Sequence, residues 1–251
     1  MTAKVNICNV QIDNVTMQET LDIFESLIEK RKPCYVTGPN IDTIIRCNND
    51  PEFAQYYQEG VLCLADGMPL LWAAKFLGTP LKEKVSGSDL VPRVCELANQ
   101  KRYRIFFLGG RPGAAETAVE KLQQTLTNLK VVGTYAPPYG FENNYEELRK
   151  ILTMIRDAEP DILFVGLGAP KQEKWIKTYH QELGVPVSMG VGVTFEFIAG
   201  VIRRAPKWMQ NAGLEWFWRL CMEPGRLWKR YLVDDMQFFS LILKQKMKGN
   251  Q

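Results

Sequence analysis

The sequence predicts an α/β fold in which a mostly parallel sheet is covered by helices on both faces. Two observations support this prediction. Short apolar runs typical of buried strands alternate with helical patterns through the first 199 residues. Several of these runs end in Gly-rich turns, as in Rossmann-like sheets. A third observation, a change of composition after residue 200, predicts a separate helical appendage at the C-terminus.

The strand and helix patterns of the body can be assigned in order. Apolar runs predict strands at Val5–Ile12, Cys34–Thr37, Val61–Ala65, Arg104–Leu108, Val131–Thr134, Asp161–Val165 and Val185–Met189. Helical periodicity predicts helices at Met17–Lys30, Ile41–Asn48, Met68–Phe76, Ser88–Lys101, Ala114–Thr125, Tyr145–Asp157 and Lys171–Tyr179. The alternation therefore predicts one α/β catalytic body over residues 1–199.

The C-terminal appendage, residues 200–251, has its own character. A boundary near Gly200–Pro206 precedes two predicted helices, Gly213–Leu220 and Gly225–Lys248, with the break at Pro224-Gly225. The appendage holds ten Lys or Arg against four Asp or Glu, and four of the six tryptophans. Basic and aromatic residues together favour a segment that lies on a membrane surface. A nucleic-acid-binding module and a helix pair with a tryptophan core are the alternatives.

Composition excludes several classes of protein. With 46% hydrophobic and 24% charged residues, the chain can build a full globular core. No run is long and apolar enough to span a membrane, and the N-terminus has no apolar signal region, so we expect a cytosolic location. The six cysteines contain no Cys-x-x-Cys pair, which predicts reduced, mostly buried thiols rather than zinc ligands or disulfides.

Glycines follow four of the predicted strands, where open α/β sheets bind ligands. The turns are Gly38-Pro39-Asn40, Gly109-Gly110, Gly166-Leu167-Gly168 and Gly190-Val191-Gly192. Glycine lets the backbone approach a ligand closely, so four such turns at one sheet edge predict a cleft for a nucleotide or nucleotide sugar. The dinucleotide fingerprint and the Walker P-loop are both absent in the proper context, which disfavours a dehydrogenase and an NTPase.

Asp66 is the most informative single residue, because it ends an apolar strand-like run and precedes Gly67. A carboxylate at that position can be partly desolvated and tuned as a base. The alternative is that Asp66 only caps the helix that starts near Met68. The one histidine, His180, lies late in a helix among polar residues and is expected at the surface.

No Asp-x-Asp pair occurs, so the usual carboxylates that hold a divalent metal on a diphosphate are missing. A diphosphate leaving group would then be neutralised by basic side chains and backbone N–H groups. Arg219, Arg226 and Arg230 of the appendage have helical spacing, although Pro224-Gly225 interrupts it.

Taken together, the motifs resemble those of the WecG/TagA/CpsF glycosyltransferases (family 26), most closely the TagA type. The matching segments cover nearly the whole chain: Thr37-Gly38-Pro39-Asn40, Ala65-Asp66-Gly67-Met68-Pro69, Val85-Ser86-Gly87-Ser88-Asp89-Leu90, Phe107-Leu108-Gly109-Gly110, Gly166-Leu167-Gly168-Ala169-Pro170-Lys171-Gln172-Glu173-Lys174-Trp175, Gly190-Val191-Gly192, Arg204-Ala205-Pro206, Gly213-Leu214-Glu215-Trp216, Arg219-Leu220, Glu223-Pro224 and Arg226-Leu227.

The resemblance implies a reaction and a cellular setting. Enzymes of this family transfer a sugar from a UDP-sugar to an undecaprenyl-diphosphate-linked sugar on the inner face of the bacterial membrane. The TagA type moves N-acetylmannosamine (ManNAc) from UDP-ManNAc to the 4-hydroxyl of lipid-linked N-acetylglucosamine (GlcNAc), making the β-1,4 linkage unit of wall teichoic acid. The resemblance further implies a GT-E type fold, inversion at the transferred carbon and independence of metal or any other cofactor.

The resemblance also implies roles for individual residues. Asp66 would be the general base, with Thr37 and Gln172 as further catalytic residues and Asn40 beside them as a substrate-binding residue of the active site. The remaining candidates would bind substrate: Lys84, Gly109, Gly110, Gly168, Gly190, Gly192, Glu196, Arg219, Arg226 and Arg230. Two departures from the family pattern and one ambiguity bear on these roles. The family usually has Asp at the position of Glu196, many relatives have Arg in place of Lys84, and Lys229 competes with Arg230 for the last place.

Some alternatives stay open at the level of sequence. The donor could instead be UDP-ManNAcA, the uronic acid of ManNAc, or another UDP-sugar, with a lipid-linked acceptor of polysaccharide synthesis. A non-catalytic nucleotide-sugar-binding protein docked on a membrane is a second alternative. Nucleic acid is disfavoured as a partner, because the basic residues lie in the Trp-rich appendage and the body is net acidic. Homo-oligomerisation is compatible with the sequence.

Overall fold

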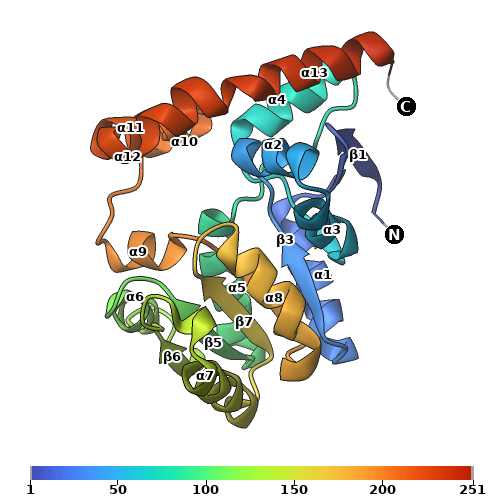
Figure 1. Cartoon of the computed structure of the whole chain (residues 1–251). Coiled ribbons are helices and arrows are strands. Elements are labelled where there is room, and N and C mark those ends of the chain that lie inside the picture. The colour runs from blue at the N-terminus through green and yellow to red at the C-terminus, as the bar shows by residue number, and fades with distance from the viewer. Residues whose placement is uncertain (1, 250–251) are drawn as a thin grey trace. The chain divides into compact units, whose positions relative to one another are not determined.

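The computed structural model (Figure 1) describes residues 2–249. Residues 1, 250 and 251, at the outer ends of the two predicted domains, lie outside the described residues. Within these limits the chain divides into two compact units. The first unit comprises residues up to 17, 37–86 and from 203 onward, and the second comprises 18–36 and 87–202. The predicted division at residue 200 stays a prediction.

A six-stranded sheet organises the fold, in the order β4-β3-β8-β7-β5-β6. Its strands are β3 (Cys34–Thr37), β4 (Leu62–Cys63), β5 (Arg104–Gly109), β6 (Lys130–Tyr135), β7 (Ile162–Gly166) and β8 (Val187–Gly190). The pairs β3–β8, β8–β7, β7–β5 and β5–β6 are all parallel. The apolar residues of β5 and β7 are buried, as expected for a sheet covered on both faces. The predicted α/β class is therefore confirmed.

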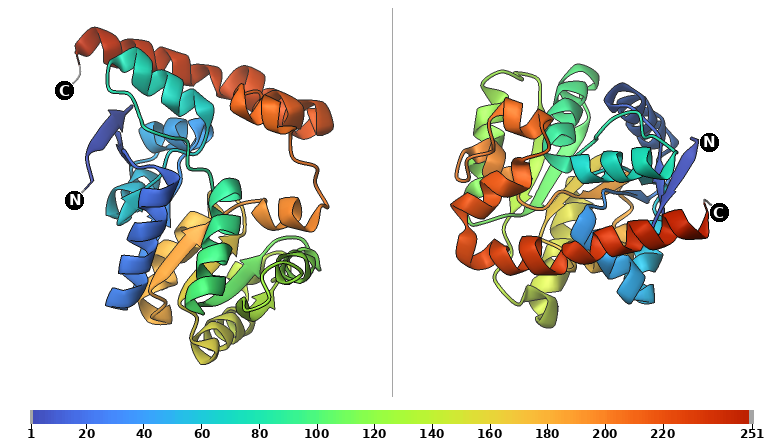
Figure 2. Two further views of the ribbon diagram at one scale, coloured as in Figure 1. Left: turned by 180° about the vertical axis from the view of Figure 1, so that it is seen from behind. Right: turned by 90° about the horizontal axis from the view of Figure 1, so that it is seen from above.

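Helices of the second unit cover both faces of its strands. They are α1 (Met17–Lys30), α5 (Gly87–Lys101), α6 (Ala114–Gln123), α7 (Tyr145–Ala158), α8 (Lys171–Leu183) and α9 (Thr194–Ala199), with a single 3-10 turn η1 (Phe141–Asn143). Figures 1 and 2 show α8 on one face of the strands and α1 and α5 on the other. Phe107 of β5 stacks on Phe195 of α9 with ring centroids 4.9 Å apart, which fixes the short helix against the sheet.

One predicted strand is wrong. Val5–Ile12 does not run straight, because Cys8 and Asn9 have positive φ angles of 48° and 67° and reverse the chain. The segment forms an antiparallel hairpin of β1 (Lys4–Ile7) and β2 (Val10–Asp13), outside the six-stranded sheet. Asn tolerates the left-handed region better than most residues, and this turn signal was overlooked in a continuous apolar pattern.

The first unit also contains α2 (Ile41–Asn49), α3 (Pro51–Glu59) and α4 (Met68–Leu77). The helix α3 was not predicted, although its start has a clear local cause. The side chain of Asp50 accepts a hydrogen bond from the backbone N–H of Phe53, and Pro51 occupies the first turn. Its apolar face is formed by aromatic residues that are buried in the unit.

The C-terminal segment is helical, but it has more breaks than predicted. It contains α10 (Lys207–Asn211), α11 (Glu215–Met222), α12 (Pro224–Lys229), a π-helical turn η2 (Arg230–Asp234) and α13 (Met236–Lys248). The predicted continuous helix over Gly225–Lys248 is therefore wrong, because the π-turn interrupts it. None of the helices within residues 2–249 is long and apolar enough to cross a bilayer.

Contacts within the first unit hold α13 in place. Figures 1 and 2 show α13 beside α2 and α4, and Phe238 and Ile242 are buried on that side. The amide of Gln245 bonds two groups of the β1–β2 hairpin: it accepts from the backbone N–H of Cys8 (2.7 Å) and donates to the carbonyl of Asn6 (2.8 Å). These contacts anchor the end of the chain to its beginning.

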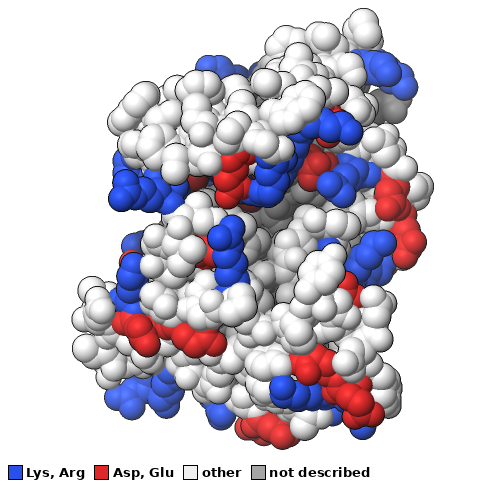
Figure 3. Space-filling model, turned by 60° about the vertical axis from the view of Figure 1, so that its left-hand side comes forward, with Lys and Arg blue, Asp and Glu red and all other residues white. Residues whose placement is uncertain are grey.

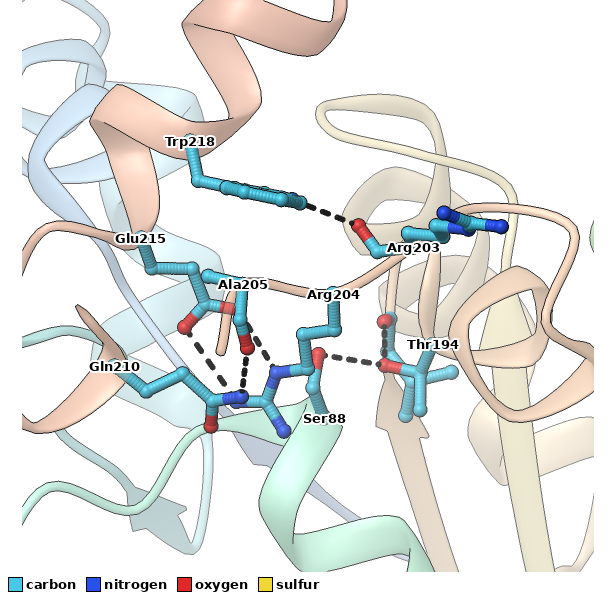
Figure 4. Close-up of polar contacts among 9 residues, drawn as sticks. Ser88, Thr194, Arg203, Arg204, Ala205, Gln210, Glu215 and Trp218 are labelled. Carbon is cyan, nitrogen blue, oxygen red and sulfur yellow. Dashed lines mark hydrogen bonds and ion pairs between the residues drawn. The ribbon is translucent and has the colours of Figure 1, made fainter. Parts of the chain in front are cut away.

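The entry to these helices is tied by polar contacts (Figure 4). The guanidinium of Arg204 donates to the carboxylate of Glu215 at 2.8 Å, and the indole N–H of Trp218 donates to the carbonyl of Arg203 at 3.1 Å. These bonds give the motif residues Arg204 and Glu215 a structural role in folding the chain back on itself. Half-buried charge-assisted bonds of this kind are stronger than surface ion pairs.

Two predictions from composition can be compared with the structure. Among the described residues all six cysteines are free thiols and only Cys221 is exposed, which confirms the expected reduced, mostly buried state. The tryptophan core considered for the appendage is wrong, because Trp208, Trp216 and Trp228 are exposed.

Candidate active site

In the first unit, the ends of β3 and β4 bring three predicted residues together. Thr37 ends β3 and is buried, with its hydroxyl donating to the carbonyl of Leu62 at 3.3 Å. The backbone N–H of Leu64 donates to the carbonyl of Thr37 at 2.8 Å. Two residues further along each segment, the N–H of Asp66 donates to the carbonyl of Pro39 at 3.1 Å. These bonds place Asp66 against the Thr37–Asn40 turn.

Asn40 is the N-cap of α2. Its side-chain oxygen accepts hydrogen bonds from the backbone N–H and the hydroxyl of Thr43, both at 3.2 Å. Capping satisfies donors that the first helical turn would otherwise leave without partners. The same bonds fix the orientation of the Asn40 amide beside the turn that bonds Asp66.

Asp66 is not a helix cap. The cap position of α4 is occupied by Gly67, which has a φ angle of 127° and supplies no side-chain hydrogen bond. A φ angle in this range is readily adopted only by glycine. Asp66 is therefore not the N-cap residue that the alternative interpretation made it; it is half-buried and lies three residues after the end of β4.

A backbone hydrogen bond brings the segment of Lys84 next to that of Asp66. The N–H of Val85 donates to the carbonyl of Ala65 at 3.0 Å, so Lys84 and Asp66 are chain neighbours of a hydrogen-bonded pair. Val85 and Ser86 are buried, which anchors this segment. The first unit thus gathers Thr37, Asn40, Asp66 and Lys84.

The three candidate arginines of the first unit have different surroundings. Arg230 lies 3.8 Å from Asp42, which is two residues after Asn40 on α2, so this arginine is tied to the helix that starts at the candidate site. Arg226 is exposed and pairs with Glu223 of its own segment. Arg219 is half-buried on α11. Of the three, Arg230 has the direct link to α2.

A carboxylate that the sequence did not single out, Asp235, lies near Arg230 and Asp42. It is buried, and its Oδ1 atom has no hydrogen-bond partner among the described residues. Burial raises the pKa of Asp235 to about 6, while the nearby Arg230 guanidinium opposes the shift and the carboxylate of Asp42 adds to it. Because Asp42 and Asp235 belong to separate helical patterns, only the fold reveals their proximity.

In the second unit, glycines at the ends of β5 and β8 pack closely against the end of β7 and the Gln172 side chain, respectively. A methyl group on Gly109 would lie 2.5 Å from the carbonyl oxygen of Gly166, and the N–H of Gly110 donates to that oxygen at 2.8 Å. A methyl group on Gly190 would lie 2.8 Å from the amide nitrogen of Gln172. Gly109 and Gly190 are therefore required by packing within the protein.

Gln172, predicted to be catalytic, bridges two of these strand-end turns. Its Oε1 atom accepts from the N–H of Gly168 at 3.2 Å and from the N–H of Gly192 at 3.1 Å. Its amide nitrogen donates to Glu173 at 3.1 Å. Gln172 is buried and is the second residue of α8, so one side chain sets the spacing of the turns that follow β7 and β8.

Gly168 and Gly192 differ from the other candidate glycines. Both have positive φ angles, 77° and 56°, and a methyl group on either would meet no atom within 4 Å. They are therefore the positions where a ligand could approach the backbone. Nearby in sequence, Glu196 accepts from the N–H of Arg111 at 3.0 Å, while its Oε2 atom is buried without a hydrogen-bond partner among the described residues.

Another contact of the second unit was missed in the sequence. The hydroxyls of Ser88 and Thr194 lie 3.4 Å apart, and Thr194 also donates to the carbonyl of Val191 at 2.6 Å (Figure 4). The contact joins the start of α5 to the turn after β8, and the motif Ser86-Gly87-Ser88 was its only signal. His180 is half-buried late in α8, where its ring meets Tyr35 edge-on.

The candidate residues thus form two groups, one in each unit. The first group combines a carboxylate, a hydroxyl, an amide and basic side chains, which can orient a hydroxyl and take its proton. The second combines open glycine turns with a buried carboxylate, which can accept hydrogen bonds from the hydroxyls of a ligand. Within residues 2–249 no cluster of three His, Cys, Asp or Glu side chains is arranged to hold a metal ion.

Comparison with known proteins decides the family. Residues 5–251 match the model of the Glycosyl transferase WecG/TagA/CpsF family. The chain belongs to this family. A relative from Bacillus subtilis (strain 168) is 28% identical over 96% of this chain and 92% of its own length. A relative from Staphylococcus aureus (strain MW2) is 28% identical over 98% of this chain and 96% of its own. Both are named N-acetylglucosaminyldiphosphoundecaprenol N-acetyl-beta-D-mannosaminyltransferase.

The family match confirms the resemblance drawn from the motifs and makes the protein a member of a glycosyltransferase family. The assignment of each candidate residue to a step of the reaction stays a prediction. The structure adds that Gln172, Gly109 and Gly190 have packing roles of their own, which any functional test must separate from chemistry.

Proposed function

We propose that this glycosyltransferase moves N-acetylmannosamine from UDP-ManNAc to the 4-hydroxyl of GlcNAc carried on undecaprenyl diphosphate, an early step of wall teichoic acid synthesis. The names of two nearly full-length relatives support the transferred sugar and the acceptor. The observation that carries the proposal in this chain is the place of Asp66: this half-buried residue follows β4, and its backbone N–H donates to the carbonyl of Pro39, between Thr37 and Asn40.

In the proposed reaction Asp66 acts as the general base. Its carboxylate takes the proton of the acceptor 4-hydroxyl as that oxygen attacks the sugar C1, and the bond from C1 to the UDP oxygen breaks. One displacement inverts the configuration at C1 and leaves UDP carrying the electron pair. The base must lie within about 3 Å of the hydroxyl, and such a group contributes about 10² to 10⁴ in rate.

The remaining candidates bind the two substrates. Gly168 and Gly192 let the backbone approach the donor substrate. The Oε2 atom of Glu196, which has no hydrogen-bond partner among the described residues, accepts a hydrogen bond from a hydroxyl of the nucleoside. Lys84 and Arg230 supply positive charge to phosphate groups, with Arg219 and Arg226 as further donors. In this scheme side chains and backbone neutralise the diphosphate, and the enzyme needs no metal.

The C-terminal helices support a peripheral location on the inner face of the membrane. The face of α13 that packs on the protein carries Phe238 and Ile242. The opposite face carries an exposed apolar stripe at helical spacing: Met236, Phe239, Leu243 and Met247. Figure 3 shows that the surface over these helices, at the top of the view, is largely uncharged, with Lys and Arg at its margins. Such a face fits the interface of an anionic bilayer.

The test compares Asp66→Asn with Asp50→Asn, which makes the same change at the cap of α3. Asn is also a good cap, so the control is expected to keep its fold and activity. Asp66→Asn should lower transfer by at least about 100-fold while UDP-sugar binding survives. Loss of binding and of thermal stability together with activity would show a structural role for Asp66 and contradict the proposed base.

A further inference from the structure

The exposed face of α4 is the strongest feature that the proposed function leaves without a role. Trp72 and Phe76 lie one helical turn apart and are 48% and 51% exposed. Lys75 is exposed between them, while Leu70, Ala73, Ala74 and Leu77 are buried on the other side. Two large aromatic residues at one exposed helix face are unusual for a helix that only supports a core.

This face continues the apolar surface of the C-terminal helices within the first unit. The ammonium of Lys246 on α13 lies 5.6 Å from the centroid of the Phe76 ring. The ring of Trp72 lies against Gly213, in the turn before α11, so closely that a methyl group there would come within 2.5 Å of it. The views in Figures 1 and 2 show α4 alongside α13.

The charges beside the surface favour one kind of partner. Lys75, Lys244, Lys246 and Lys248 are all exposed on α4 and α13. Aromatic residues flanked by lysines suit the headgroup region of a bilayer, where the rings reach the acyl boundary and the ammonium groups meet lipid phosphates.

We propose that α4 is a second membrane-contacting element, in which Trp72 and Phe76 enter the interface of an anionic bilayer together with the stripe on α13. This deepens the proposed function and rests on it for its consequence. Asp66 is separated from the start of α4 by Gly67 alone. Seating α4 in the interface would therefore set the depth of the candidate base relative to a lipid-linked acceptor.

The experiment measures binding of the full chain to vesicles of phosphatidylcholine with about 30% phosphatidylglycerol. The variant is the double change Trp72→Ser with Phe76→Ser, and the matched control is Tyr145→Ser, which removes an exposed aromatic of α7. The double variant should bind vesicles about tenfold to hundredfold more weakly than the wild type and the control. Trp72→Phe with Phe76→Leu should restore binding, because it keeps the apolar surface.

Two further readouts decide between explanations. The fluorescence of Trp72 is the difference in emission between the wild type and Trp72→Phe. Vesicles of brominated lipid should quench this fluorescence when they are added. The double serine variant loses the contacts of Trp72 with Gly213 and of Phe76 with Lys246, so its melting temperature should fall, but it should stay folded and keep its turnover of a water-soluble acceptor. It should lose turnover of an acceptor embedded in vesicles. Vesicle affinity equal to that of Tyr145→Ser would overturn the proposal. A second result would also overturn it: the wild type forms a dimer, and the serine changes dissociate this dimer but leave vesicle binding intact. The surface would then bind a second copy of the chain.

The failure of this proposal is distinct from failure of the proposed function. If the wild type transfers no sugar to any lipid-linked acceptor, but vesicle binding still depends on Trp72 and Phe76, the membrane surface stands without the transferase reaction. If transfer is normal and binding is independent of these two residues, the reaction stands without α4.

Discussion

Replacing Gln172 by Ala tests whether one side chain sets the spacing of two strand-end turns. The change removes the acceptor of two backbone N–H groups, those of Gly168 and Gly192. A hydrogen bond of this kind contributes about 1 kcal/mol, and more where water cannot replace it, so we expect a loss of about 2 to 3 kcal/mol in the free energy of unfolding. The turns would also lose their fixed separation, which should weaken UDP binding.

The assay pairs urea unfolding with calorimetric titration of UDP. The matched control is Gln181→Ala, on the exposed side of the same helix, which should change neither quantity by more than about 0.5 kcal/mol. Gln172→Glu gives a second test. It keeps an acceptor but places a carboxylate against the buried Glu173, so it should be at least as destabilising as Ala. If Gln172→Ala matches Gln181→Ala in both stability and UDP affinity, the bridging role is refuted.

Three other predictions concern Asp235, Gly213 and Gly192. Asp235→Asn should stabilise the protein at pH 7.5 by about 1 to 3 kcal/mol, because burial raises the pKa of Asp235 and so penalises its charged form. In unfolding measurements this gain in stability should shrink as the pH falls from about 6 towards 4, where Asp235 becomes protonated. A gain independent of pH would contradict the burial argument. Gly213→Ala should lower the melting temperature, because its methyl group would meet the Trp72 ring, and Trp72→Ala should relieve part of that cost in a double mutant. Gly192 and Gly184 both have positive φ angles and open surroundings, so replacing either by Ala should lower the free energy of unfolding by about 1 kcal/mol. Only Gly192→Ala should weaken UDP binding. Equal UDP affinities of the two variants would remove Gly192 from the donor site.

Much of the fold could be predicted because its signals are local. Apolar runs such as Arg104–Leu108 form buried parallel strands, and turns of glycine and asparagine end them, as the sequence predicts. The hairpin at Cys8-Asn9 was missed because two residues of positive φ interrupt an otherwise continuous apolar pattern. The π-turn at Arg230–Asp234 was missed because its residues also fit a regular helix.

The places of the candidate residues in the fold could be predicted better than their contacts, and their membership in an active site stays a prediction. Glycine and carboxylate at strand ends identify Asp66 and Gly192 from sequence alone. The bridging bonds of Gln172 and the approach of Asp235 to Arg230 depend on which helices pack together, which periodicity does not specify. The orientation of Trp72 is likewise a tertiary property, since an aromatic residue in an apolar helix would ordinarily be assigned to the core.

The measurement that tests the central claim most directly is release of UDP from UDP-ManNAc, in the presence of EDTA, with and without GlcNAc-diphosphate-lipid acceptor. The account predicts release that depends on the acceptor, survives EDTA and falls by at least about 100-fold in Asp66→Asn. Turnover of UDP-ManNAcA in place of UDP-ManNAc would keep the family and correct the donor. No acceptor-dependent release from any UDP-sugar would contradict the proposed transferase activity.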